Sequence, residues 1–347
     1  MYLLKHRSGF SFSKLFKRFL TSMKVLKTIG THDGTFHCDE VLGCSMLKIV
    51  YPDAEIVRSR KDEVLNNCDI VIDVGGKFDP DRYLFDHHQK SFDHSMSTLL
   101  PGKKWTMKLS SAGLVYCHFG KDIIKVICKD MKENDLESVF DKVYEGFVQE
   151  VDAIDNGVPI CDGKENYFIS TNLSSRVSRF NRSWIVPESK FDETEAFYKA
   201  MDLVTGEFID KVRRTVTEWL PAKTIVENAL EKRHEIHPSG EIIELETFCP
   251  WKGHFFALEE QMHLEPSIKF VLFQEKTVWR VQAVSKNETS FELRTPLHEQ
   301  WRGLRDEELS STAGISGCIF VHSTGFIGGN QTREGALQMA AKSLKAN

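Results

Sequence analysis

The sequence lacks several features that would assign it to a specialised class of protein. Its eight cysteines form no CxxC pair, which argues against a thiolate zinc site and, since several lie in apolar runs, against a disulfide framework. No apolar run approaches the ~20 residues that span a bilayer, so we expect no stable membrane association. The net charge of −5 shows no overall basic excess, so any nucleic-acid contact has to come from a local basic groove.

Acidic residues are absent from residues 1–27, a segment that interleaves basic residues such as Lys14, Lys17 and Arg18 with apolar ones such as Phe16 and Phe19. A basic, serine-containing, acid-free and amphipathic leader is typical of a mitochondrial presequence. We therefore predict a location in the mitochondrial matrix. The alternative is a disordered basic tail, and the sequence leaves open whether the leader is removed.

Beyond the leader, short apolar runs alternate with helical periods. The runs Val25–Gly30, Ala54–Arg58 and Ile70–Val74 predict strands, and residues 39–50 predict a helix. This alternation favours a parallel sheet flanked by helices. Further along, Ser110 is expected to cap another helix, and a helical stretch over 136–154 should end at the turn that begins at Asp155.

A length of 347 residues favours two domains. We assign residues 28–190 to an α/β catalytic domain and 191–221, a helical pattern broken at Pro221, to a helical linker. Residues 222–347 contain several β-type runs, a glycine-rich turn and a helix from about Thr332 to Leu344, which predict a smaller α+β domain. The sequence does not indicate the oligomeric state.

Side chains that bind metals recur just after the predicted strands. They are His32, His37, Asp39, Asp73 and the triplet Asp86-His87-His88. An open α/β sheet places its active-site crevice at strand ends, so we expect these donors to converge. Mixed imidazole and carboxylate ligands suit Mn²⁺ or a related divalent ion such as Mg²⁺.

This set predicts a two-metal hydrolase. Such a site needs a carboxylate that bridges the ions, for which Asp73 is the best candidate, and His87 with either Asp155 or Asp152 could complete the second ion. Two ions would activate water and stabilise charge on a phosphoryl group, while His88 suits phosphate contact. Each residue taken alone is also consistent with a turn, a cap or a packed side chain, and only the combination favours a metal site.

The combination resembles a known family. Asp86-His87-His88, together with Ile72-Asp73-Val74-Gly75, is similar to the motifs of the DHH phosphoesterase superfamily, which includes RecJ exonucleases, oligoribonucleases and manganese inorganic pyrophosphatases. More closely, Gly30-Thr31-His32-Asp33-Gly34-Thr35-Phe36-His37-Cys38-Asp39-Glu40 and Gly325-Phe326-Ile327-Gly328-Gly329 resemble the melanocyte proliferating gene protein family, a eukaryotic branch of that superfamily. The similarity runs from about Thr28 to the C-terminus.

The resemblance implies a parallel-sheet DHH-type domain with a dinuclear site, followed by a smaller substrate-binding domain. It implies that one ion is held by His32, His37 and Asp73, and the other by Asp39, Asp73, His87 and Asp155. His37 stands where the wider superfamily usually has an aspartate, which removes one negative charge from the site. Asp73, His87 and His88 would then act in catalysis.

In the second domain, the glycine-rich segment resembles the substrate loop of DHH nucleases. Glycines let backbone amides approach a phosphate, so Gly328 and Gly329, with His88, His322 and Arg333, are candidate substrate contacts. The segment Trp301-Arg302-Gly303-Leu304-Arg305 offers a stacking ring and two cations for single-stranded nucleic acid, or else a core tryptophan beside solvated arginines.

The family resemblance implies a 3′-to-5′ exoribonuclease that acts on single-stranded RNA or short oligonucleotides in mitochondria, with the nucleus as a second location. Two alternatives remain open at the level of sequence. One is a phosphatase or pyrophosphatase for a small phosphorylated metabolite, and the other is a non-catalytic RNA-binding protein on an inherited enzyme fold.

Overall fold

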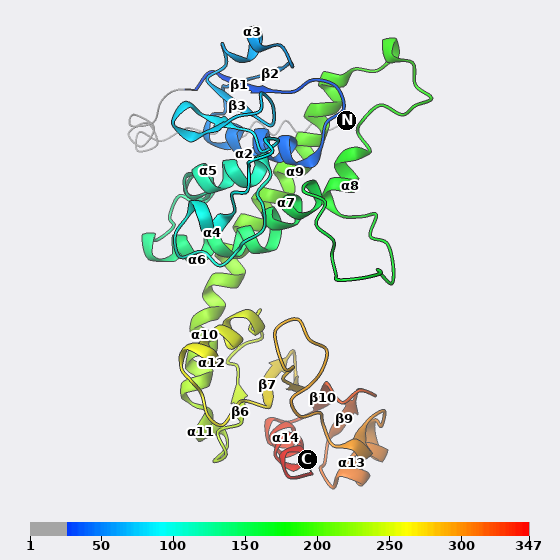
Figure 1. The fold of residues 1–347 in the computed structure, drawn as a ribbon. Coiled ribbons are helices and arrows are strands. Elements are labelled where there is room, and N and C mark those ends of the chain that lie inside the picture. The colour runs from blue at the N-terminus through cyan, green and yellow to red at the C-terminus, as the bar shows by residue number, and fades with distance from the viewer. Residues whose placement is uncertain (1–25, 347) are drawn as a thin grey trace, which may run out of the picture. The chain divides into compact units, whose positions relative to one another are not determined.

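The computed structural model describes residues 26–346 of the chain (Figure 1). The expected leader lies outside this range apart from Leu26 and Lys27, so its predicted role stays a prediction. The chain divides into two compact units, with the boundary between Arg213 and Arg214. Among residues 26–346, no helix combines the length and the apolar character that crossing a bilayer requires.

The first unit contains a five-stranded sheet in the order β2-β1-β3-β5-β4. Its strands are β1 (Thr28–Thr31), β2 (Glu55–Arg58), β3 (Ile70–Ile72), β4 (Phe78–Asp79) and β5 (Leu84–Phe85). All neighbours pair in parallel except β4, which runs antiparallel to β5 at the edge. The predicted α/β fold with a parallel sheet is thereby confirmed.

The first unit also contains several α-helices in its described part. They are α2 (Cys38–Val50), α3 (Asp62–Leu65), α4 (Met96–Leu99), α5 (Ser111–Ile127), α6 (Glu133–Val143), α7 (Gln149–Asp155), α8 (Leu173–Ser178) and α9 (Glu193–Arg214). Helix α2 is buried along most of its length and packs against both α5 and β3. Gly43 permits the close approach to β3, since a Cβ there would lie 2.9 Å from Cδ1 of Ile72.

The stretch predicted as helical over 136–154 is helical throughout in the structure, although not all of it is α-helix. A π-helical turn, Tyr144–Val148, joins α6 to α7. Helix α7 ends at Asp155, with Asn156 as its C-cap and Gly157 in the left-handed region at φ 66°. The turn signal after Asp155 therefore placed the end of the helix correctly.

The expected linker is part of the first unit up to the boundary. Phe197 of α9 packs edge-on against Phe36 at 5.4 Å between ring centroids, and Phe208 packs against Tyr116 at 6.4 Å. The boundary expected at residue 190 therefore moves to 213. The prediction that Pro221 breaks the helical pattern is wrong. Pro221 is the second residue of the next helix, which directly continues a π-helical turn over Thr215–Trp219.

The second unit contains a five-stranded sheet in the order β6-β7-β8-β10-β9. Only β6 and β7 pair in parallel, as expected for an α+β unit. Its elements are α10 (Leu220–Glu231), α11 (Arg233–Ile236), β6 (Ile242–Glu244), α12 (Lys252–Gln261), β7 (Phe270–Glu275), β8 (Val278–Ala283), α13 (Asp306–Ala313), β9 (Cys318–Val321), β10 (Ile327–Asn330) and α14 (Arg333–Ala346).

Alternation along β7 gives the second sheet two apolar faces. Val271 and Phe273 belong to a core with apolar residues of α10 and α12, whereas Phe270 and Leu272 belong to another with α13 and α14. Side chains point to opposite faces at successive strand positions, so one strand supplies both cores. Helices therefore cover both sides of this sheet.

Candidate metal centre

Parallel strands of the first sheet bring the predicted metal ligands together. His32 follows β1, Asp73 follows β3, and the Asp86-His87-His88 triplet follows β5. Because β1, β3 and β5 are parallel neighbours, their carboxyl ends meet at one edge of the sheet. Helices complete the cluster with Asp39 from the start of α2 and Asp155 from the end of α7.

Asp73 lies between two histidines. Its Oδ2 is 3.4 Å from Nε2 of His32, and its Oδ1 is 3.5 Å from Nε2 of His87. The hydroxyl of Ser111 donates to Oδ1 at 3.0 Å. The residue has a φ of 58°, an unfavourable conformation for aspartate that is typically kept only where the surrounding structure requires it. Each carboxylate oxygen thus faces a different imidazole, as a bridging ligand would.

A second group joins Asp39, His87 and Asp155, with possible ligand atoms within 4.8 Å of one another. Nε2 of His87 lies 3.1 Å from Oδ2 of Asp155 and 3.9 Å from Oδ2 of Asp39. These atoms are buried, and despite the short distances neither oxygen of Asp39 and neither nitrogen of His87 meets a partner in hydrogen-bond geometry among residues 26–346. Buried polar atoms without partners are costly, and a cation would satisfy them.

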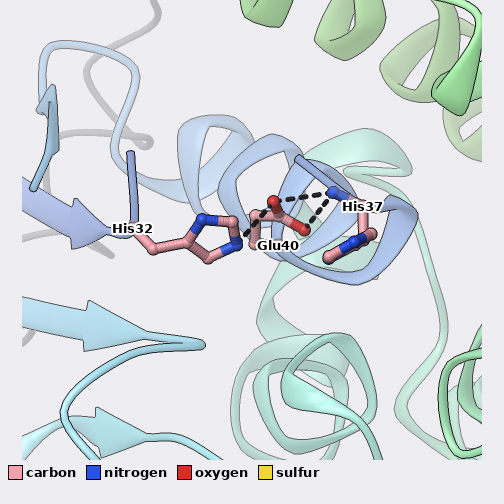
Figure 2. A group of neighbouring side chains, drawn as sticks. All are labelled: His32, His37 and Glu40. Carbon is pink, nitrogen blue, oxygen red and sulfur yellow. Dashed lines mark hydrogen bonds and ion pairs between the residues drawn. The ribbon is translucent and has the colours of Figure 1, made fainter. Parts of the chain in front are cut away.

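Glu40 belongs to the centre although sequence reasoning did not select it. Its Oε1 lies 2.9 Å from Nε2 of His32, and its carboxylate accepts the backbone amide of His37 at 2.8 and 3.0 Å (Figure 2). His32, His37 and Glu40 form a third group of possible ligands, of which His37 is exposed. The sequence did contain one signal for Glu40. It lies three residues after the helix cap His37, at the position where a capping box has its acidic residue.

The electrostatics of the cluster favour a cation. Burial, followed by the charges of Asp73 and Asp155, raises the pKa of Asp39 well above its usual range. Burial also raises the pKa of Asp155. Burial alone would lower the pKa of His32, but its bonds to Asp73 and Glu40 raise that pKa to about 10. Carboxylates outnumber imidazoles here, so a divalent ion fits the donor set.

Asp86 and His88 lie beside these groups. Asp86 accepts hydrogen bonds from the amides of Gly76 at 2.6 Å and His88 at 3.1 Å, and lies 2.7 Å from Nδ1 of His88. The His88 side chain is 62% exposed. It lines a 290 Å³ pocket together with His32, His37 and Asp73. Asp86 therefore holds the turn and orients His88 toward the pocket.

The structure separates Asp152 from Asp155. Asp152 is fully buried and accepts hydrogen bonds from the amide of Ser110 at 2.9 Å, the hydroxyl of Ser110 at 2.7 Å and the hydroxyl of Tyr144 at 3.0 Å. Its oxygens are occupied by these donors, so Asp155 is the aspartate that joins the metal groups. Ser110 occupies the predicted cap position of α5, but its side chain serves Asp152 and does not cap the helix.

The glycine-rich segment forms a strand and not the expected loop, and its predicted contact with a substrate stays a prediction. Gly328 and Gly329 are buried in β10, which pairs with β8 and β9 inside the second sheet. A Cβ on Gly328 would lie 3.1 Å from the carbonyl oxygen of Phe320, so a larger residue would require its neighbours to shift. The turn between β9 and β10 is made by Gly325, at φ 75°.

The other predicted substrate residues of the second unit differ in accessibility. His322 is exposed, with Nδ1 3.0 Å from Oγ1 of Thr324. Arg333 pairs with Glu244, its Nη2 2.8 Å from Oε2, so its charge is already partly neutralised. Trp301 is only 3% exposed and packs in the core, so it cannot offer a stacking surface and that interpretation is wrong.

Sequence comparison assigns the chain to a family. The family model MYG1_exonuc, described as an uncharacterised protein family (UPF0160), matches residues 28–344. The chain belongs to the MYG1 family. The MYG1 exonuclease of Bos taurus is 51% identical to it over 323 residues, covering 91% of this chain and 84% of the relative. That of Homo sapiens is 49% identical over 335 residues, covering 94% and 88%. The family predicted from the motifs is therefore confirmed.

Solved structures show weaker similarity to this MYG1 family chain. The structure of RecJ in complex with Mn²⁺ from Thermus thermophilus is 12% identical, with a TM-score of 0.24, and the match covers 92% of this chain and 52% of that chain. A second structure, of exonuclease RecJ bound to manganese, is 13% identical with a TM-score of 0.24, and the match covers 92% of this chain and 90% of that chain. The assignment of fold therefore rests on the strand order and pairing of the chain itself.

Proposed function

We propose that the protein is a divalent-metal-dependent phosphodiesterase that acts as a nuclease. The observation that carries this proposal is the position of Asp73 between His32 and His87, each of which belongs to a group of possible metal ligands. The mixed imidazole and carboxylate set suits two Mn²⁺ ions, and Mg²⁺ is also acceptable. Bound ions would lower the pKa of water and stabilise negative charge on phosphate oxygens.

Residues of the chain would position the substrate beside such ions. His88 is exposed in the pocket, and Asp86 fixes its ring so that the imidazole can donate to a phosphate oxygen. Its hydrogen bond to Asp86 raises the pKa of His88, which favours the cationic form that binds a phosphodiester. Ser111 holds Asp73 in place through Oδ1.

The finer proposal is a 3′-to-5′ exoribonuclease that acts on single-stranded RNA or short oligonucleotides. Its support is the name exonuclease carried by the relatives from Bos taurus and Homo sapiens, together with the resemblance of the motifs. The acid-free leader of the sequence supports the mitochondrial matrix as the location, and the nucleus is proposed as a second one.

The test uses single-stranded RNA labelled at its 5′ end, incubated with Mn²⁺ and the full chain. A ladder of shortened labelled fragments indicates digestion from the 3′ end, whereas direct release of a labelled mononucleotide indicates the opposite direction. Asp73→Asn and a chelator should both abolish the ladder. Asp33→Asn is the matched control, because Asp33 neighbours His32 but belongs to none of the ligand groups.

Two outcomes would contradict parts of the proposal. If Asp73→Asn retains wild-type metal-dependent activity, the carboxylate of Asp73 is not required for catalysis. If the wild-type protein leaves RNA intact but hydrolyses a small phosphate ester, the substrate is a phosphorylated metabolite. A matched DNA oligonucleotide, run beside the RNA, measures the preference between the two polymers.

A further inference from the structure

Residues 166–187 of the first unit contain no acidic side chain, although the chain carries a net charge of −5. This acid-free segment includes α8 and parts of the connections on either side of it (Figure 1). It also carries large aromatic side chains that face solvent: Tyr167 is 76% exposed, Phe168 82% and Trp184 90%. Exposed aromatic rings close to basic side chains that no acidic side chain neutralises are unusual on a protein surface, and they indicate a binding role.

Two arginines of the acid-free segment keep their charge available. Arg179 donates to the carbonyl oxygen of Ser170 at 2.9 Å, and Arg182 donates to that of Val186 at 2.7 Å. In the described part of the chain neither forms an ion pair, whereas Arg176 pairs with Glu207. A carbonyl orients a guanidinium without neutralising it, so Arg179 and Arg182 can still attract an anion.

The acid-free segment is hydrogen-bonded to the loop that carries His32 and His37. Asn181 pairs with the backbone of Phe36: its Oδ1 accepts from the amide at 3.0 Å, and its Nδ2 donates to the carbonyl at 2.7 Å. Just past the segment, Glu193 accepts the amide of Gly34 at 2.8 Å. The stretch that carries Arg182 and Trp184 therefore leaves and rejoins the fold beside the metal ligands.

We propose that the acid-free segment binds single-stranded nucleic acid next to the metal centre. Trp184 stacks on a base, and Arg179 and Arg182 contact phosphates of the same strand. Stacking needs an unpaired base with a free face, which a single strand offers and a duplex does not. A polyanion suits a segment that carries two arginines without ion-pair partners among the described residues and no acid of its own better than an apolar protein partner would. The inference rests on the proposed nuclease function, whose substrate it positions.

The test measures binding apart from cleavage. The full chain is titrated into a fluorescein-labelled single-stranded RNA of about ten nucleotides, a length within the usual site size for single strands, in chelator, and anisotropy gives Kd. Trp184→Ala should weaken binding by roughly 10-fold, and Trp184→Phe should retain most of the affinity because it keeps a stacking ring. Phe291→Ala is the matched control, since Phe291 is fully exposed on the second unit and should not affect Kd.

Salt dependence tests the arginines. Arg182→Gln should lower the slope of log Kd against log salt by about 0.7, the value for one lost phosphate contact on a single strand. Unchanged affinity in Trp184→Ala and an unchanged slope in Arg182→Gln would overturn the proposal. Sedimentation velocity adds another test: if Trp184→Ala dissociates a dimer and still binds RNA normally, the surface serves a second copy and the proposal is wrong.

The two proposals can fail separately. If the wild-type chain does not hydrolyse RNA with Mn²⁺ under any tested condition, the proposed function fails whatever the binding data show. If the wild-type chain hydrolyses RNA and Trp184→Ala does so with the same KM, the function stands and the acid-free segment is not its binding surface.

Discussion

Nε2 of His32 lies 2.9 Å from Oε1 of Glu40, and both side chains are buried. The same carboxylate accepts the amide of His37, so one acid contacts two predicted metal ligands at once. The carboxylate of Glu40 therefore links the residue after β1 to the residue before α2. Glu40 therefore either binds a metal itself or fixes the imidazole that does, and both roles depend on its negative charge.

Glu40→Gln should weaken Mn²⁺ binding by about 10- to 100-fold, because the amide keeps the shape of the side chain but removes the charge. Titration calorimetry of the full chain with Mn²⁺ measures the change. Glu55→Gln, an exposed acid on β2, is the control and should bind as the wild type does. Wild-type affinity in Glu40→Gln would exclude Glu40 from the centre.

Mn²⁺ should stabilise the first unit. Without a cation, burial and neighbouring acids raise the pKa of Asp39, which shows that ionising this cluster is unfavourable. A ligand that binds only the folded state stabilises it by about 2.7 kcal/mol at a concentration about 100 times Kd. Thermal unfolding with increasing Mn²⁺ should show a rising Tm for the wild type and a constant Tm for Asp73→Asn. An identical rise in both would contradict a site at Asp73.

Asp155 and Asp152 should respond differently to the same substitution. Asp155→Asn should lose Mn²⁺ affinity and activity, because Asp155 faces His87 in a ligand group. Asp152→Asn should retain both, since an amide can still accept from Ser110 and share a hydrogen bond with Tyr144. Metal content and RNA cleavage of the two purified variants decide the matter. The reverse pattern would restore Asp152 as the ligand.

The parallel sheet and the convergence of donors could be predicted because both follow from local pattern. Apolar runs between helical periods mark parallel strands, and parallel strands bring His32, Asp73 and His87 to one edge. Glu40 was missed because a capping acid looks the same in sequence whether or not its carboxylate also reaches a histidine. Asp152 and Asp155 lie one turn apart on the same helix, so only packing could separate them.

The glycine-rich segment shows why residue type alone misleads. Glycine is suited both to a phosphate-binding loop and to a crowded strand because it has no Cβ, which lets other groups approach its backbone closely. Gly328 lies against Phe320, Leu297 and Met339 in the folded unit, and no local pattern encodes these contacts. Trp301 likewise became a core residue through packing with α13 and α14.

Gly328→Ala should lower the stability of the second unit by about 1–3 kcal/mol, as expected for overpacking. A Cβ there would lie 3.0 Å from Cδ1 of Leu297 and 3.1 Å from the carbonyl oxygen of Phe320. Urea unfolding followed by circular dichroism measures the loss. Gly206→Ala, in α9 with no atom within 4 Å of the added Cβ, should be neutral or stabilising. Lost RNA binding with unchanged stability in Gly328→Ala would favour the substrate-loop interpretation after all.

Arg294 should be a main contributor to the stability of the second unit. Its two terminal nitrogens each lie 2.6 Å from an oxygen of Glu259, both side chains are only 13% exposed, and its guanidinium lies over the ring of Phe255. Arg294→Ala would leave the Glu259 charge nearly buried without its partner, at a cost of about 2–4 kcal/mol after allowance for residual solvent. Hydrogen exchange of the amides in β7 and α12 reports this loss for the second unit alone.

Lys286→Ala is the control for Arg294→Ala. It breaks an exposed pair with Glu292 and should change the free energy of opening measured by hydrogen exchange by less than about 0.5 kcal/mol. Equal effects of the two substitutions would show that burial does not strengthen the Arg294 pair.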